Sequence, residues 1–404
     1  MEQSYFGKNC YGALLKKLTL GSALFVAFLV IVNPVFNVFL LRLGLPVPSF
    51  LDERGVSACV VFVSLGCIFV CLAHRKMDLF LGSIGVLCAL IVVSTVCNGG
   101  DLVIALVDWL PCLAVSMLVA LLAEKRVKLL LSVFFGACVL YLLGNLVFLL
   151  AGHDLFRFDS VDNYPFGYRN VTFRIAIPAC ACAFVLDALE EEAVSLRTIT
   201  VYMVALVEVL VGYSATSACA LAMMGVLLLV VKTWNCAKVL NAVSYLGCYV
   251  LSFVGLVVLR VQNVFGFIIE PILHRTVTLT GRTDLWDAAF SHLSNLHLLY
   301  GYGTGYMWNT LLLNGTPEKH AHNDALHLLM LGGVGALVAL ALAVLLSVRR
   351  LYIERCDAVA IGLSIGLSGF FLVSIVEVAA CPGFFFLLAV SYYYPYFHAA
   401  DERA

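Results

Sequence analysis

Charged residues are scarce in this sequence. Only 12% of its 404 residues are Asp, Glu, Lys or Arg, about half the share that an ordinary soluble domain carries. No basic tract is long enough to follow a nucleic-acid backbone, and we therefore predict no nucleic-acid partner. Because 63% of the residues are hydrophobic, a soluble globular enzyme is excluded as well, and the chain is predicted to be a membrane protein.

Recognisable cofactor and metal motifs are also lacking. The 15 cysteines lie mostly inside apolar runs, where free cysteine behaves as a small hydrophobic residue, and their spacing fits neither zinc nor haem. The segment GYGTGY at 301–306 is rich in glycine, but no strand precedes it, so it is not a dinucleotide-binding fingerprint. It is predicted to form a tight turn, and no cofactor is predicted.

Long apolar runs fill most of the chain. A helix that crosses a bilayer needs about 20 apolar residues, and the chain is predicted to contain about 12 such spans, the first of them uncleaved. The predicted fold class is therefore all-α, a polytopic transmembrane helical bundle in which residues 1–404 form a single domain. The predicted spans are 20–41, 55–73, 78–97, 102–122, 128–150, 173–190, 197–213, 216–231, 239–261, 322–347, 357–376 and 381–398.

Basic clusters set the predicted orientation. The clusters at 74–76, 124–128 and 349–355 all lie in the cytoplasm when the N-terminus does, as the positive-inside rule requires. Both termini are then cytoplasmic, and the two long connectors, 151–172 and 262–321, face outward. Outer basic residues run against this rule, so either snorkelling at the headgroups or an anion site must explain them. They include Arg169, Arg174, Arg275 and Arg282.

The second long connector is unusually polar. Six of the nine histidines fall between positions 274 and 327. A short amphipathic helix is predicted to begin at Asp284, with Thr283 as its N-cap. Its apolar stripe is predicted to consist of Trp286, Phe290, Leu293 and Leu296. Arg282 would lie just before this helix, where its guanidinium and free backbone N–H groups could hold a phosphate together.

The connector ends in the segment HAHND at 320–324, directly before a predicted span. A metal site formed by His320, His322 and Asp324 is conceivable. Few carboxylates lie near, however, and the start of a helix would separate the three side chains, so we predict no metal. The pKa of histidine suits a general base at the water-facing mouth of a span, and His322 is the candidate.

Three acidic residues lie within or at the ends of the predicted spans: Asp108, Glu208 and Glu377. Carboxylates at such depths are often functional. Polar contacts between helices explain them at least as well. The sequence leaves both interpretations open.

Several segments carry a resemblance to a known family. GRTDLW at 281–286, GYGTG at 301–305 and HAHNDALHLLMLGGVG at 320–335 occur in that order on one outer connector and at its end. Together they resemble the O-antigen polymerase and O-antigen ligase family of bacterial envelope proteins. YSATSACALAM at 213–223 is similar to the family's serine-containing segment, with Ala218 where an arginine is usual. The interval from Asn323 to the glycines at 332–335 differs from the family's by one residue, and outside roughly 275–335 the similarity is one of hydropathy.

The resemblance implies an inverting, metal-independent glycosyltransferase of the GT-C type. Its donor would be a glycan on undecaprenyl pyrophosphate, presented at the outer face of the bacterial cytoplasmic membrane, and its acceptor would be another glycan or lipid A core. His322 and Arg282 would be catalytic, with the guanidinium stabilising the leaving pyrophosphate. The further substrate-binding candidates are Arg169, Arg174, Arg275, His320, Asn323 and Tyr302.

The family resemblance fits both a polymerase and a ligase. Residues 94–100, STVCNGG, resemble a segment of polymerases of Gram-positive surface polysaccharides. This favours a polymerase, and a ligase that transfers the glycan to lipid A core is the alternative. A transporter of polysaccharide or lipid is the second alternative, but it would have essential charges at mid-membrane depth and internal repeats. The polar residues gather outside the bilayer instead, which favours an enzyme.

Overall fold

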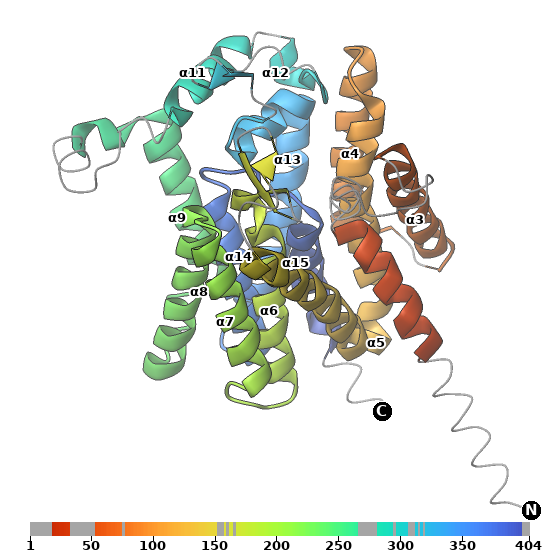
Figure 1. The fold of residues 1–404 in the computed structure, drawn as a ribbon, viewed down its shortest axis with the longest axis vertical. Coiled ribbons are helices and arrows are strands. Elements are labelled where there is room, and N and C mark those ends of the chain that lie inside the picture. Colours follow the sequence, from red (N-terminus) through yellow and green to blue (C-terminus); the bar gives the residue numbers. More distant parts are fainter. Residues whose placement is uncertain are drawn as a thin grey trace, which may run out of the picture.

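The computed structural model describes residues 18–32, 53–74, 77–151, 157–158, 161–164, 167–265, 281–293, 296–305, 312–313, 316–317 and 320–397. In these residues the protein is a bundle of helices with a few very short strands (Figure 1). The predicted all-α class is confirmed. Within this part of the chain, 5 helices are long and apolar enough to cross a membrane. They are α3 (Glu53–His74), α4 (Leu79–Cys97), α5 (Leu102–Ala151), α8 (Ala215–Trp234) and α13 (Asp324–Ile353).

Shorter helices complete the bundle. They are Leu18–Val32, α6 (Phe173–Leu189), α7 (Leu196–Val211), α9 (Ala242–Ser252), which continues as the π-helix η4 (Phe253–Val258), α14 (Ala358–Val373) and α15 (Pro382–Tyr393). Each of the predicted spans contains helical residues. The two predicted spans 102–122 and 128–150 both lie in α5, which is interrupted between them at Arg126 (φ −146°, ψ 33°). The number of helices that cross the membrane stays a prediction.

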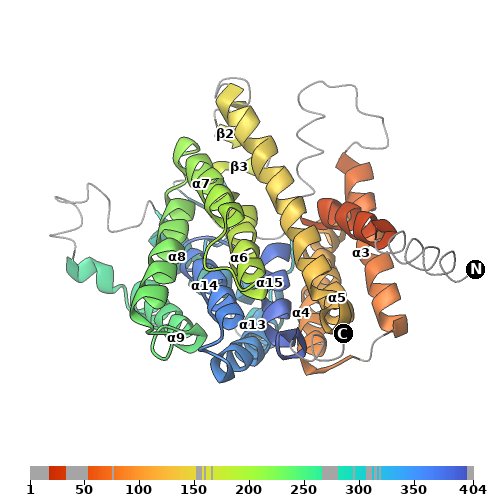
Figure 2. The same ribbon diagram turned by 90° about the horizontal axis from the view of Figure 1, so that it is seen from below.

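Three helices form the interior of the bundle. Seen from below, α6, α14 and α15 lie between the group α7, α8 and α9 and the group α3, α4 and α5 (Figure 2). The backbones of α14 and α6 approach closely because Gly366 has no side chain. A Cβ atom at Gly366 would lie only 2.6 Å from the Cβ of Ala181. The rings of Phe134 and Phe386 are stacked with centroids 3.6 Å apart, which joins α5 to α15.

The outside of the bundle is apolar. Phe62 and Phe69 on α3 are each 75% exposed, and Trp234 at the end of α8 is 77% exposed. Exposed apolar side chains of this size are unfavourable in water. Their positions on long apolar helices indicate that these faces contact lipid.

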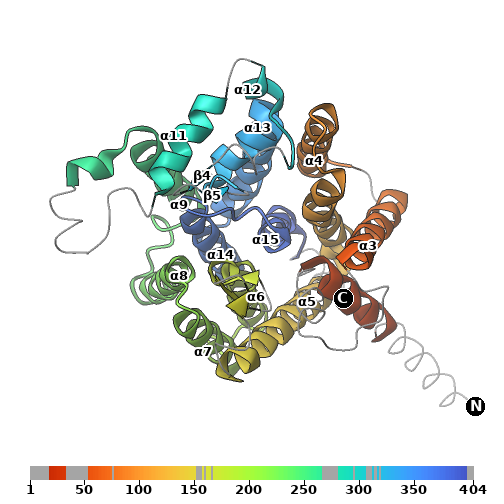
Figure 3. The same ribbon diagram turned by 45° about the horizontal axis from the view of Figure 1, so that its top comes forward.

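Short elements cover one end of the bundle. The first long connector contains a small antiparallel sheet and the 3-10 helix η3 (Arg169–Val171). Its strands are β1 (Arg157–Phe158), β2 (Val161–Tyr164) and β3 (Gly167–Tyr168). The second connector contains η5 (Val261–Phe265), α11 (Arg282–His292), α12 (His297–Tyr300) and the paired strands β4 (Leu312–Leu313) and β5 (Thr316–Pro317). When this end is turned forward, α11 and α12 lie beside the start of α13 (Figure 3).

The short helix predicted in the second connector is present, but it begins earlier than expected. It starts at Arg282, and its N-cap is Gly281 in the left-handed conformation (φ 85°). The prediction of Thr283 as the N-cap was therefore wrong, because the chain has already turned into the helix at that position. Arg282 consequently lies in the first turn of α11.

The predicted apolar stripe of this helix is only partly correct. Trp286 is fully buried, but Phe290 is 40% and Leu296 is 64% exposed. The helix ends at His292, so Leu296 no longer shares a face with Trp286. The buried side of α11 consists of Thr283, Leu285, Trp286 and Ala289.

The segment at 301–305 forms the tight turn that its glycines predict. Gly303 has a φ of 74°, and a Cβ atom there would lie 2.3 Å from the Cα of Thr95 on α4. The N–H of Gly303 donates to the carbonyl of Leu331 (2.9 Å), beside the break in α13 at Gly333 (φ 68°). The N–H of Thr304 donates to the hydroxyl of Thr95 (2.9 Å). The turn thus joins the C-terminal end of α4 to the first part of α13.

Candidate functional site

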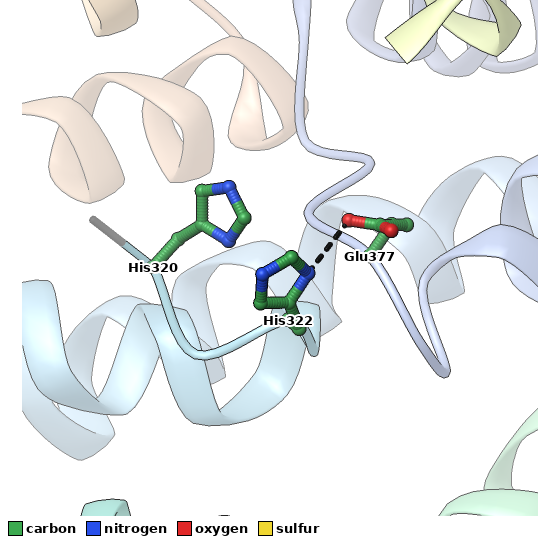
Figure 4. Close-up of side chains that lie close together, drawn as sticks. All are labelled: His320, His322 and Glu377. Carbon is green, nitrogen blue, oxygen red and sulfur yellow. Dashed lines mark hydrogen bonds and ion pairs between the residues drawn. The ribbon is translucent and has the colours of Figure 1, made fainter. Parts of the chain in front are cut away.

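The imidazole of His322 lies where the chain turns into α13. His322 has a left-handed backbone conformation (φ 48°) directly before the N-cap residue Asn323. A non-glycine residue with positive φ is strained and often marks a functional position. The Nδ1 atom of His322 lies 2.9 Å from Oε2 of Glu377, and the two side chains are 10% and 6% exposed (Figure 4). The predicted base therefore has a carboxylate that orients its ring.

Glu377 lies between α14 and α15 and contacts both residues predicted to be catalytic. Its other oxygen, Oε1, is 2.5 Å from Nη2 of Arg282 and 3.4 Å from Nδ2 of Asn170. Burial by itself raises the pKa of the Glu377 carboxyl, but the hydrogen bond and charge of His322 and the charge of Arg282 outweigh it. The pKa lies below its usual value, so Glu377 is a carboxylate at neutral pH.

Asn323 and Asp324 hold the segment that carries Glu377 against the start of α13. The amide of Asn323 accepts from the N–H of Leu326 (3.0 Å) and donates to the carbonyl of Ile375 (3.0 Å). Oδ1 of Asp324 accepts from the N–H groups of Ala379 (2.9 Å) and Ala380 (3.1 Å). These bonds fix the distance between His322 and Glu377.

Asn323 was predicted to bind substrate, and the geometry gives it another role. Its side chain is completely buried. The amide oxygen caps α13, and the amide nitrogen contacts the carbonyls of Ser374 and Ile375. Asn323 is therefore placed as a positioning residue.

Arg282 reaches Glu377 from the first turn of α11, with 17% of its side chain exposed. The helix is anchored from two sides. The indole N–H of Trp286 donates to the carbonyl of Ala321 (3.0 Å), next to His322. Arg260 donates to the carbonyl of Thr283 (3.0 Å) and lies over the ring of Trp286. Because α11 is tied to the segment that carries His322, Arg282 and His322 are positioned as one unit.

Arg174 adds a second cation beside this cluster. It lies in the first turn of α6 and donates to the carbonyl of Val378 (3.4 Å), the residue after Glu377. Its Nε atom is buried without a hydrogen-bond partner. The side chain of Arg169 and all of Arg275, the other two predicted anion-binding arginines, lie outside the described residues.

The serine-containing segment at 213–223 lies close to the same cluster. The hydroxyl of Ser214 donates to that of Ser217 (2.7 Å), and Ser217 contacts the carbonyl of Asn170 (3.5 Å). Since the amide of Asn170 reaches Glu377, the start of α8 supports the Glu377 side of the site.

Tyr302 was also predicted to bind substrate, and its side chain contacts the neighbouring segments of the connector. It is 6% exposed. Its hydroxyl donates to the carbonyl of His292 (2.5 Å), and its ring stacks on that of His297 at 3.9 Å between centroids. These contacts join the ends of α11 and α12 to the turn at 301–305.

The possible metal ligands differ from those considered in the sequence. Asp324 is engaged by backbone N–H groups, so it does not complete a site with His320 and His322. Glu377 takes its place: one donor atom each of His320, His322 and Glu377 lie within 4.8 Å of one another (Figure 4). Both oxygens of Glu377 already bind cationic or N–H donors. A metal would have to displace Arg282 or the His322 hydrogen bond, and the donor set therefore fits a metal poorly.

Two of the three acidic residues singled out in the sequence, Glu377 and Glu208, have different surroundings. Glu377 belongs to the site, whereas Glu208 on α7 forms a hydrogen bond with Asn145 on α5. Glu208 is thus a polar contact between helices. The signal for Glu377 was an acid in an otherwise apolar stretch, but no local pattern indicated that it would meet His322 and Arg282.

No protein-family model, curated protein or solved structure gives a significant match to this chain.

Proposed function

We propose that this protein is a membrane glycosyltransferase that polymerises oligosaccharide repeats, carried on undecaprenyl pyrophosphate, into a surface polysaccharide of the O-antigen or capsule type. The observation that carries the proposal is the carboxylate of Glu377, which binds His322 through one oxygen and Arg282 through the other. A proton acceptor and a cation are thereby held in one cluster. Inverting transfer from a pyrophosphate donor needs both groups.

In the proposed reaction, a hydroxyl of the acceptor sugar attacks the anomeric carbon of the donor. Its proton passes to Nε2 of His322, the nitrogen that carries the ring lone pair when Nδ1–H donates to Glu377. The bond between the anomeric carbon and the phosphate oxygen breaks, the configuration inverts, and undecaprenyl pyrophosphate leaves. Glu377 stabilises the imidazolium that forms, as a buried carboxylate does beside a catalytic histidine.

Arg282 is proposed to stabilise the negative charge that develops on the leaving pyrophosphate. Glu377 engages its Nη2 atom, and a guanidinium has further N–H donors for phosphate oxygens. Arg174, whose guanidinium lies beside the segment of Glu377, is a second cation for the same group. Arg169, Arg275 and His320 are further proposed substrate contacts.

The proposed location is the bacterial cytoplasmic membrane, with both termini in the cytoplasm and the active site facing outward. Exposed apolar residues along the helices, such as Phe62 and Phe69, support a lipid environment in which the polyprenyl tail could lie. The acceptor would arrive from the outer side. No metal or cofactor takes part in the proposed reaction.

The test uses purified protein in nanodiscs with an oligosaccharide on undecaprenyl pyrophosphate as the substrate, in the presence of EDTA. We expect a ladder of longer lipid-linked glycans on a gel. His322→Ala, Arg282→Ala and Glu377→Gln should each lower the turnover by roughly 10²-fold or more, the range for loss of acid–base or oxyanion groups. The matched control is His292→Ala, because His292 contacts the carbonyl of Ala288 on its own helix.

The outcomes separate the candidate functions. Transfer that occurs only after lipid A core is added would identify a ligase that uses the same site. Turnover that is unchanged in His322→Ala and Arg282→Ala would disprove the assigned site. Flux of the lipid-linked glycan across the membrane without any new glycosidic bond would identify the transporter instead.

A further inference from the structure

A second site lies at the end of α13 opposite to His322. There, Leu346, Arg349, Arg350 and Ile353 of α13 and Tyr392 of α15 line a pocket of about 290 Å³. This volume is close to the lower end of the range for small-molecule sites. It suits a compact polar group better than a long polyprenyl chain.

Two arginines give the pocket positive charge. Neither Arg349 nor Arg350 forms an ion pair or a hydrogen bond within the described residues, and Arg350 lies 5.4 Å from the ring centroid of Tyr392. Arg197, on the same side of the bundle, is instead paired with Asp187 (2.6 Å). Two neighbouring guanidiniums that have no ion pair in the described part of the chain are suited to a phosphate group.

The surroundings of the pocket are apolar on the side that faces away from the bundle. Ile353 and Leu345 are each 55% exposed on α13, where a lipid tail could contact them. Tyr392 stacks on Phe80 at 4.6 Å between centroids, which fixes one wall of the pocket. A tyrosine that borders both apolar and polar surroundings is typical of the membrane interface.

We propose that this pocket binds the phosphate-bearing headgroup of an anionic phospholipid. The headgroup phosphate would contact Arg349 and Arg350, and the acyl chains would lie along Leu345 and Ile353. Basic pockets between helices on the cytoplasmic side of a membrane commonly select such lipids. By the positive-inside rule this end of α13 is cytoplasmic, so the lipid belongs to the inner leaflet, and its site is separate from the proposed active site.

The test measures lipid retained by the purified full-length protein, using native mass spectrometry. The protein is incubated with phosphatidylglycerol, cardiolipin, phosphatidylcholine or inorganic phosphate. We expect the two anionic lipids to stay bound during collisional activation in the mass spectrometer and phosphatidylcholine to dissociate. Since a basic residue near the membrane contributes roughly fivefold in affinity, the variant Arg349→Gln/Arg350→Gln should bind about 25-fold more weakly. Inorganic phosphate should not compete at millimolar concentration.

Two further variants give the experiment its controls. Arg355→Gln removes a nearby arginine that contacts the carbonyl of Tyr352 and does not line the pocket, and it should retain lipid as the wild type does. Leu346→Trp fills the pocket while keeping both arginines, so it should lose the lipid even if the double variant does not fold. Equal retention by wild type and Leu346→Trp, equal binding of phosphatidylcholine, or displacement by inorganic phosphate would each overturn the proposal.

Discussion

Nitrogen donors of three residues surround the carboxylate of Glu377. They belong to His322, Arg282 and Asn170, and they come from the start of α13, the start of α11 and the residues before α6. A buried carboxylate is costly unless such donors satisfy it. The position of Glu377 therefore depends on three separate segments, and a displacement of any of them would remove a donor from its carboxylate.

The pKa of Glu377 gives a prediction about stability and pH. Because the pKa is lowered in the folded state, the ionised group stabilises the fold above the usual glutamate pKa of about 4.3. This contribution is lost as the pH falls through the lowered pKa. The Tm of the wild type should exceed that of Glu377→Gln at about pH 5, and the difference should shrink as the pH falls further. A difference that stays constant down to about pH 3 would contradict the lowered pKa.

At the scale of elements, the bonds from the start of α13 to the segment between α14 and α15 decide the geometry of the site. Asp324→Ala would leave the N–H groups of Ala379 and Ala380 without their acceptor. We expect a loss of about 2 kcal/mol in unfolding free energy and a lower kcat. Asp324→Asn keeps an acceptor oxygen and should restore most of both. Failure of the asparagine variant to recover more than the alanine variant would show that the charge, and not the hydrogen bonds, is needed.

The turn at 301–305 is a second such element. In Gly303→Ala, the alanine would have to adopt the positive φ of Gly303, which is strained for a residue with a side chain. Its Cβ atom would also lie 2.3 Å from the Cα of Thr95. We expect it to lower the unfolding free energy by more than about 2 kcal/mol, measured as a decrease in Tm. Gly66→Ala is the control, because nothing lies within 4 Å of its Cβ position on α3. Equal Tm values for the two variants would show that the turn does not pack against α4 as described.

At the scale of the whole molecule, the orientation can be tested with native cysteines. Cys97 and Cys356 are both exposed, the first at the end of α4 near the proposed active site and the second after α13 at the opposite end. A membrane-impermeant maleimide added to intact spheroplasts should label Cys97 and leave Cys356 unlabelled. Both should react after permeabilisation, as mapped by mass spectrometry. The reverse pattern would place the His322 site on the cytoplasmic side.

Local patterns predicted the elements of the fold well. Run length and hydropathy located α3, α4, α8 and α13 to within a few residues at most boundaries, because a membrane helix is defined by apolar length alone. The cap of α11 was misplaced because Gly281, in a left-handed conformation, starts the helix before the polar residue Thr283 can. The stripe failed at Leu296 because the helix ends at His292, where the sequence has no clear stop signal.

The sequence by itself determined that this is a helical membrane protein, and it located the segment with His322 and Arg282 as a polar stretch rich in histidine. Only the tertiary structure decided which residues meet there. Glu377 is 55 residues from His322 and 95 from Arg282 in the chain, and no local pattern links such distant positions. Their contact depends on the packing of α11, α13 and α14, which also buries Asn323 and Tyr302. Composition and periodicity describe single helices, whereas a site between helices exists only once they have packed.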